Sequence, residues 1–104
     1  MKAKEAIWEA YRSTDTPELR QELRQELLSQ YLPLVRNVAS RMALGFPKSV
    51  ELGDLVSTGV CGLIEAFKNY DPERGVKFET YAVPRIRGAI LDELPRYADN
   101  LRGE

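Results

Sequence analysis

The chain has 104 residues, enough for one domain of ordinary size with one modest hydrophobic core. Its formal net charge is -1, from 15 basic and 16 acidic residues, so the overall composition lacks the strong basicity typical of nucleic-acid-binding proteins. One cysteine, no histidine and no apolar run of the roughly 18 residues that cross a bilayer exclude an intramolecular disulfide, the usual zinc and iron–sulfur sites and a transmembrane helix, so we expect a cytoplasmic protein without a metal or cofactor.

Residues 2–13 have the pattern of a short amphipathic helix, with apolar residues at three- and four-residue spacing and charged residues between them. The apolar positions are Ala3, Ala6, Ile7, Ala10 and Tyr11. A helix that closes the fold is the interpretation we favour, and a helix that binds a partner is the alternative. The environment of Trp8 distinguishes the two.

A long helix is predicted to start at Thr16, Pro17 and Glu18, because Thr caps free N–H groups, Pro suits the first helical position and Glu favours the positive end of the dipole. Its predicted core face consists of Leu19, Leu23, Leu27, Tyr31, Leu34, Val38 and Met42. Pro33 lacks an N–H group, which predicts a kink or a break near residues 31–34. Gly45 and Pro47 are expected to end the helix.

A third helix is predicted over residues 51–69 from an apolar stripe of Leu52, Leu55, Val56, Leu63, Ile64 and Phe67. Gly59 and Gly62 interrupt the stripe at a cost of about 1 kcal/mol each relative to Ala, so we expect them to let a neighbouring helix come close. Cys61 has apolar neighbours in the sequence and is predicted to be a small buried hydrophobic residue rather than a redox sensor.

The segment from Asp71 to Gly75 is predicted to form a turn, because Pro72 sets one backbone angle and Gly75 permits a left-handed one. A last helix is predicted from Glu79 or Thr80 to the residue before Pro95. Its apolar stripe is Tyr81, Ala82, Ile86, Ala89, Ile90 and Leu94, and Pro84 falls early in it. No segment alternates like a strand, so the predicted fold is all-α, a compact bundle of about four helices in a single domain over residues 1–104.

Two stretches separate this chain from a generic helical bundle: YLPLVRNVASRMA, followed by DLVSTGVCGLIEAFKNYDPERGVKFETYAVPRIRGAILDEL. In this order they closely resemble the second conserved domain of bacterial sigma factors over residues 27–94, with residues 95–104 a divergent tail. The sequences DP, GVKFETY and PRIRGAI are most similar to the alternative class that serves flagellar and sporulation genes. The resemblance implies a transcription-initiation module and not an enzyme.

The resemblance implies that the helix over residues 51–69 docks on the clamp helices of the largest subunit of core RNA polymerase. The implied contact residues are Asp54, Ser57 and Thr58, where a carboxylate in the first helical turn would pair with Arg on the polymerase. Asp54 also has a simpler explanation, which is that it stabilises the positive end of its own helix dipole.

The resemblance also implies that residues 76–87 separate the promoter strands at the minus-ten element and hold flipped bases of the non-template strand. Such bases need flat rings to stack on and cations along the backbone. The candidate DNA contacts are Arg74, Lys77, Phe78, Thr80, Tyr81, Arg85 and Arg87, with Leu91 and Asp92 at the implied duplex-reading end. From Arg74 to Leu91 four basic residues face one acidic residue, a local net charge of +3. For Phe78, Tyr81 and the arginines, core rings and an ordinary solvated face are the alternative.

The sequence departs from the sigma-factor pattern in two places. Pro84 and Arg85 stand where housekeeping sigma factors have tandem tryptophans, which is usual for the alternative class and predicts weaker spontaneous promoter melting. Pro95 should end the last helix early, and the tail after it differs from the family. This tail motivates a second hypothesis, a polymerase- or anti-sigma-factor-binding decoy that no longer recognises promoters.

Overall fold

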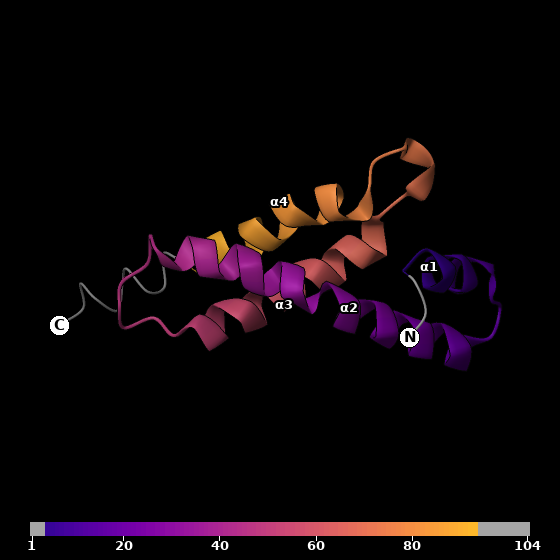
Figure 1. Cartoon of the computed structure of the whole chain (residues 1–104), viewed down its shortest axis with the longest axis horizontal. Helices are drawn as coiled ribbons and strands as arrows, with labels where there is room; N and C mark the ends of the chain where they lie inside the picture. Colours follow the sequence, from indigo (N-terminus) through magenta and orange to yellow (C-terminus); the bar gives the residue numbers. More distant parts are fainter. Residues whose placement is uncertain (1–3, 94–104) are drawn as a thin grey trace. The chain divides into compact units, whose positions relative to one another are not determined.

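The structure, a computed structural model, describes residues 4–93, and helices joined by loops are the regular secondary structure of this part of the chain (Figure 1). Its elements are α1 (Lys4–Ser13), α2 (Pro17–Ala43), α3 (Leu52–Asn69), the 3₁₀ turn η1 (Pro72–Arg74) and α4 (Phe78–Leu91). The all-α prediction with about four helices is confirmed. Pro95, the tail over residues 95–104 and the start of the first predicted helix lie outside the described residues.

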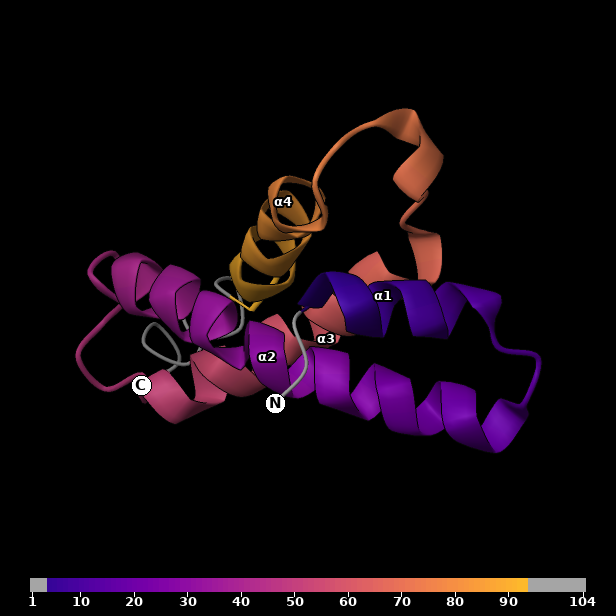
Figure 2. The same ribbon diagram turned by 45° about the vertical axis from the view of Figure 1, so that its right-hand side comes forward.

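The chain divides into two compact units, Met1–Pro33 and Leu34–Glu104. In the first unit, α1 runs alongside the first half of α2 (Figure 2). Ile7 of α1 is fully buried, and Leu23 and Leu27 of α2 are buried with it. The indole Nε1 of Trp8 donates a hydrogen bond to the hydroxyl of Tyr31 at 2.9 Å. These contacts support the interpretation that the first helix packs on its own chain.

The helix α2 begins at Pro17 and ends at Ala43, close to the predicted positions. It passes through Pro33 without interruption, so a break at this position is not present. Pro33 is exposed, and the ring therefore does not disturb the packed side of the helix.

The predicted core face of α2 is only partly right. Leu19 in the first turn is 42% exposed, and Val35, which was not predicted, is fully buried together with Ala39. A three-to-four spacing leaves the exact positions of an apolar stripe open, because adjacent helical positions differ by about 100° and neighbouring helices decide which of them are covered.

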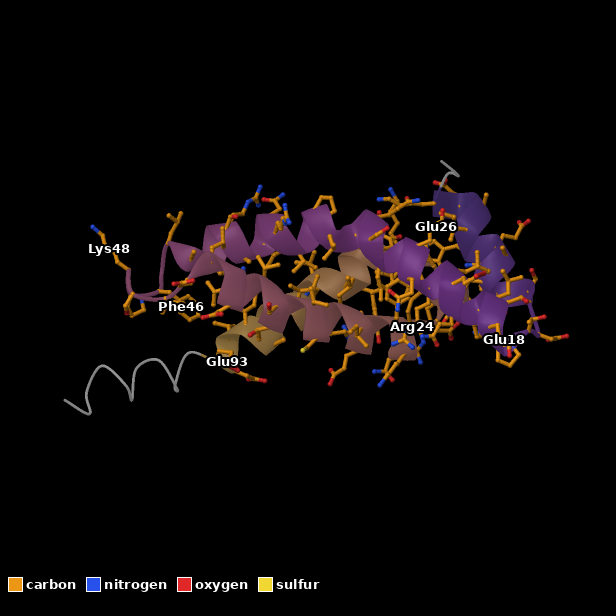
Figure 3. All side chains as sticks on the ribbon, turned by 90° about the horizontal axis from the view of Figure 1, so that it is seen from below. Glu18, Arg24, Glu26, Phe46, Lys48 and Glu93 are labelled. Atoms are coloured by element: carbon orange, nitrogen blue, oxygen red, sulfur yellow. The ribbon has the colours of Figure 1, made fainter. Side chains whose placement is uncertain are left out.

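The second unit has a core drawn from the second half of α2, from α3 and from α4. Its buried apolar residues are Val35, Val38, Ala39, Leu55, Leu63, Ala66, Phe67, Phe78, Ala82, Ile86 and Ile90. The helices α3 and α4 pack directly against each other. Figure 3 labels Phe46 and Lys48 in the loop that joins α2 to α3, and Glu93 just beyond α4.

The two helices come close because α3 has glycines at the contact, as the sequence predicted. A Cβ atom built on Gly62 would lie 2.5 Å from the backbone oxygen of Arg85 and 2.9 Å from Cα of Ile86. A Cβ atom on Gly59 would lie 2.8 Å from Cγ1 of Val35. The backbone of α4 thus lies against α3 at a point where no side chain larger than hydrogen fits.

The connection between α3 and α4 is the predicted turn. The side chain of Asp71 accepts a hydrogen bond from the N–H of Glu73, and Gly75 adopts a φ of 80°, which a residue with a side chain rarely takes. The N–H of Gly75 donates to the carbonyl oxygen of Pro72. This turn fixes where the chain re-enters the helical core.

The helix α4 starts at Phe78 and ends at Leu91, with Asp92 as its C-cap. It therefore begins slightly before the predicted start. It ends short of Leu94, which the sequence analysis included in its stripe. Pro84 lies in the second turn, where it deletes one helical hydrogen bond.

Replacing Gly62 by Ala is expected to lower the free energy of unfolding by about 1 to 3 kcal/mol, because the new methyl group meets backbone atoms of α4 that cannot turn away. Urea denaturation of the full chain measures the change. Gly53→Ala is the matched control in the same helix. No atom lies within 4 Å of its Cβ position, so this variant should be neutral or stabilised by up to about 1 kcal/mol. Equal losses for both variants would contradict the close helix contact.

Candidate functional site

The exposed face of α3 carries the residues that the sequence analysis proposed for protein docking. Asp54 lies in the first turn and is exposed, and Ser57 lies one turn further on and is also exposed. Thr58 is half-buried, and its hydroxyl donates to the backbone oxygen of Asp54 at 3.0 Å. The carboxylate of Asp54 and the hydroxyl of Ser57 are therefore accessible on one side of the helix, whereas Thr58 serves mainly the helix itself.

The prediction that Cys61 is buried is wrong. Cys61 is exposed and reduced. It lies seven residues after Asp54, two helical turns along, and so shares the exposed side of α3. The buried side of this helix passes through Leu55, Gly59 and Leu63 instead. Apolar neighbours in the sequence did not reveal this, because successive helical residues point in different directions.

Pockets of about 290, 320 and 530 Å³ lie on the second unit, and the largest of these three lies where the turn meets α4. This pocket of about 530 Å³ is lined by Asn69, Tyr70, Asp71, Arg74, Val76, Tyr81 and Arg85. It brings together Arg74, Tyr81 and Arg85, three of the predicted DNA contacts. The other lining residues were not predicted, although Tyr70, an aromatic residue directly before the turn, was a visible signal.

Aromatic rings form the inner wall near this pocket. The ring of Phe78 packs on Phe67 with centroids 4.8 Å apart, and on Tyr70 at 5.2 Å. Phe78 is only 3% exposed, so its ring is a core ring and is not accessible to a base in this structure. Tyr81 is half-buried and lines the pocket, and its ring centroid lies 5.4 Å from that of Tyr70. The burial of Phe78 supports the core interpretation for that residue, whereas Tyr81 reaches the surface.

Two arginines contribute positive charge to the pocket. The guanidinium carbon of Arg85 lies 3.7 Å from the centre of the Tyr81 ring, and its Nη1 donates to the backbone oxygen of Tyr81 at 3.1 Å. Nε of Arg74 lies 3.9 Å from a carboxylate oxygen of Asp71, with both side chains largely exposed. A surface pair of this kind is weak, so Arg74 can exchange it for another anion at little cost.

The remaining candidates lie outside this pocket. Lys77 and Thr80 are exposed at the start of α4. Arg87 and Leu91 line a separate pocket of about 320 Å³ with Arg41, Met42, Gly45 and Phe46. Asp92 lines a third of about 290 Å³ with Cys61, Gly62, Glu65, Arg85, Gly88 and Ala89.

Arg41 was missed by the sequence analysis. It stands at the end of α2, far from Arg87 in the sequence, and only the packing of the second unit brings both residues to one pocket. No local pattern could have paired them.

Within residues 4–93, none of the helices combines the length and the apolar character needed to cross a membrane. The same residues hold no group of three or more acidic, cysteine or histidine side chains arranged to bind a metal ion.

Comparison with known proteins finds a family-level match. The family described as Sigma-70 region 2 matches residues 27–99 of this chain. The match reaches into the segment after residue 94 that the sequence analysis took to be divergent.

Individual relatives are similar over the same part of the chain. The RNA polymerase sigma-D factor of Bacillus subtilis is 49% identical over 69 residues, which are 66% of this chain and 27% of that protein. The RNA polymerase sigma factor FliA of Escherichia coli K12 is 51% identical over 71 residues, 68% of this chain and 30% of the relative. FliA of Pseudomonas aeruginosa is 46% identical over 74 residues, 71% and 30% respectively. The aligned part thus spans less than a third of each of these relatives.

The exposure of Cys61 leads to a direct test. The native protein should react with a soluble thiol reagent at the rate of a free thiol, without denaturant, because the side chain is on the surface of α3. The chain has one cysteine, so absorbance of the released reporter counts this site alone. Protection that disappears only on unfolding would show that the exposed side of α3 is assigned wrongly.

Proposed function

The chain belongs to the sigma-70 region 2 family, and we propose that it is a transcription-initiation module that binds core RNA polymerase and recognises and opens the minus-ten promoter element. Sigma factors are initiation factors and not enzymes. The observation that carries the proposal is the pocket of about 530 Å³, because it joins stacking rings and arginines at one end of the α3 and α4 pair.

The pocket has the chemistry that an unpaired base requires. Tyr70 and Tyr81 offer ring surface, and Arg74 and Arg85 offer positive charge for the backbone on either side. The side chains of Asn69 and Asp71 add donors and acceptors that a flipped base would meet at its hydrogen-bonding edge. The volume lies within the usual range of ligand pockets, roughly 300 to 1,000 Å³.

The other candidates extend this surface. Lys77 and Thr80 are exposed beside the turn, where they would contact phosphates of the single strand. Arg87, Leu91 and Asp92 lie towards the end of α4, and we assign them to the duplex at the upstream edge of the element. Phe78 is left out of direct contact because it is buried.

The exposed side of α3 is the proposed docking surface for the clamp helices of the largest polymerase subunit. Asp54 would pair there with an arginine, and Ser57 would add a polar contact. Asp54 and Asn69 are 15 residues apart on one helix, about 22 Å along its axis, so docking and base capture use separate places. Such a factor works in the cytoplasm with the polymerase, and an anti-sigma factor is a further proposed partner.

A decoy that binds polymerase without reading promoters is the competing function. Its motivation was the tail after Leu94, and the family match to residue 99 weakens it. The decoy predicts polymerase binding together with no capture of single-stranded minus-ten DNA by the complex.

Asp54→Ala should weaken binding to core polymerase by roughly 10- to 150-fold, because a hydrogen bond to a charged group contributes about 1.5 to 3 kcal/mol. Fluorescence anisotropy of the labelled chain measures the affinity. Glu22→Ala removes an exposed carboxylate from α2 in the other unit and serves as the control with unchanged affinity. An equal loss for Glu22→Ala would point to general electrostatics.

Tyr81→Ala should leave polymerase binding unchanged and reduce capture of a single-stranded minus-ten oligonucleotide by about 1 to 3 kcal/mol, because a stacking ring is lost. Tyr81→Phe keeps the ring and should retain most of the capture. If Tyr81→Ala and Asp54→Ala weaken both activities alike, the division into two surfaces is wrong.

Opening of duplex promoter DNA should be weaker than with a housekeeping sigma factor. Pro84 and Arg85 stand where housekeeping sigma factors have two stacking rings. We therefore expect the ratio of affinity for a premelted promoter to affinity for the duplex promoter to be larger for this chain than for a housekeeping sigma factor. Permanganate reactivity of unpaired thymines measures the opening. Equal opening of duplex promoters by both factors would contradict this expectation.

A further inference from the structure

Three exposed leucines gather at one end of the second unit. Leu44, in the loop between α2 and α3, is 90% exposed, and Leu52 at the start of α3 and Leu91 at the end of α4 are 45% and 46% exposed. The loop, the start of α3 and the end of α4 lie together at this end (Figures 1 and 3). Exposed apolar residues that are grouped, unlike single ones, indicate a surface that another molecule covers.

Charged side chains of both signs lie beside these leucines. Arg41 at the end of α2 and Arg87 of α4 line the pocket of about 320 Å³. Glu51 and Asp54 lie on either side of Leu52 at the start of α3. All four charged side chains are exposed, and none of them forms an ion pair with another residue of the part of the chain that the structure describes. This end of the unit therefore carries two unpaired cations and two unpaired carboxylates on neighbouring elements.

Such a pattern is complementary to itself. In a two-fold dimer the same surface is used on both subunits, so a contact between two different residues occurs twice. The cations of one copy can then face the carboxylates of the other, and the leucines of both copies leave water between them. The formal net charge of each copy is only -1, so two copies repel each other little.

We propose that this end of the second unit binds a second copy of the chain in a two-fold dimer, in which Arg41 of each copy pairs with Glu51 of the other. We call it the loop-end surface, and it consists of the three leucines and the four charged residues named above. The leucines supply the apolar area of the contact, and the charges select its partner and its orientation.

Other occupants complement the loop-end surface less completely. Promoter DNA would be attracted by Arg41 and Arg87, but its phosphates would be repelled by Glu51 and Asp54. A polymerase contact along α3 would use Asp54 and leave the arginines uncovered. A second copy carries the complement of every charge on the surface, because it carries the same surface.

The dimer would compete with promoter recognition. It covers Asp54, which is proposed to dock on polymerase, together with Arg87 and Leu91, which are proposed to contact the duplex. This consequence rests on the function proposed above, whereas the self-association does not. The free chain would thus be held in an inactive pair until core polymerase takes up one copy.

Sedimentation equilibrium of the full chain tests the dimer at concentrations from about 1 μM to about 1 mM. The mass should rise from that of the monomer to that of the dimer and no higher, because a two-fold contact is closed. Arg41→Glu should raise the dissociation constant at least about tenfold, since it places like charges opposite each other at two positions. Arg36→Glu, the same reversal at another exposed position of α2, should leave the constant unchanged.

A charge swap identifies the pair. Glu51→Arg alone should weaken the dimer as Arg41→Glu does, and the two changes in one chain should restore the dissociation constant to within about threefold of wild type. Leu44→Ser should also weaken association. Leu44 is 90% exposed, so the thermal midpoint of this variant at low concentration should match that of the wild type.

Several outcomes would overturn the inference. A chain that stays monomeric up to about 1 mM would leave the loop-end surface to promoter DNA or polymerase alone. Growth beyond the dimer would exclude two-fold closure, and equal weakening by Arg36→Glu and Arg41→Glu, or a swap that restores nothing, would exclude the specific pair.

Core polymerase separates this inference from the function on which its consequence rests. Added polymerase should convert the dimer into complexes with one copy of the chain, and a complex that retains the dimer would contradict the shared surface. If polymerase binds neither the dimer nor the monomeric Arg41→Glu variant, the proposed function fails while the measured self-association stands.

Discussion

The contact of Gly62 with the backbone of α4 is the constraint on which the second unit depends. Because no Cβ fits between Gly62 and the carbonyl group of Arg85, the backbones of α3 and α4 touch at this point. This contact sets the position of the residues around Arg85 along α3. The turn spans the two helix ends with Gly75 in its left-handed conformation. The pocket of about 530 Å³ lies between this turn and α4.

A nearly neutral chain can present two surfaces of different chemistry because the charges are separated along one helix pair. The start of α3 exposes Asp54, and the turn with α4 carries an excess of positive charge over residues 74–91. At physiological ionic strength the screening length is about 8 Å, shorter than the roughly 22 Å between the two ends of α3. A protein partner and a nucleic acid would therefore meet largely independent fields, which the net charge of the chain conceals.

The aromatic residues of α4 show how a small difference in helical position changes a role. Phe78 and Tyr81 are three residues apart, yet Phe78 is sealed against Phe67 while Tyr81 lines the pocket beneath Arg85. Three residues correspond to about 300° of rotation, enough to carry one ring from the core to the edge of the packed face. The core ring supports the wall of the pocket, and the edge ring supports Arg85. Both contribute to the candidate site, although only Tyr81 lines the pocket.

Local physical rules in the sequence determined the helices and the turn. Pro17 and Gly75 restrict or permit the backbone angles of their own positions, so the start of α2 and the turn were predictable. Gly59 and Gly62 lack side chains, so a close approach of a neighbouring helix to α3 was predictable as well. The colinear motifs also indicated the family.

Which side of each helix is covered was decided only by tertiary packing. Cys61 is exposed, Phe78 is buried, and Arg41 joins Arg87 across the second unit, because a helical position acquires an environment from neighbours that are distant in the sequence. The seating of Arg85 on Tyr81 also needed the three-dimensional structure, since a four-residue spacing permits the contact but does not select the rotamer that makes it.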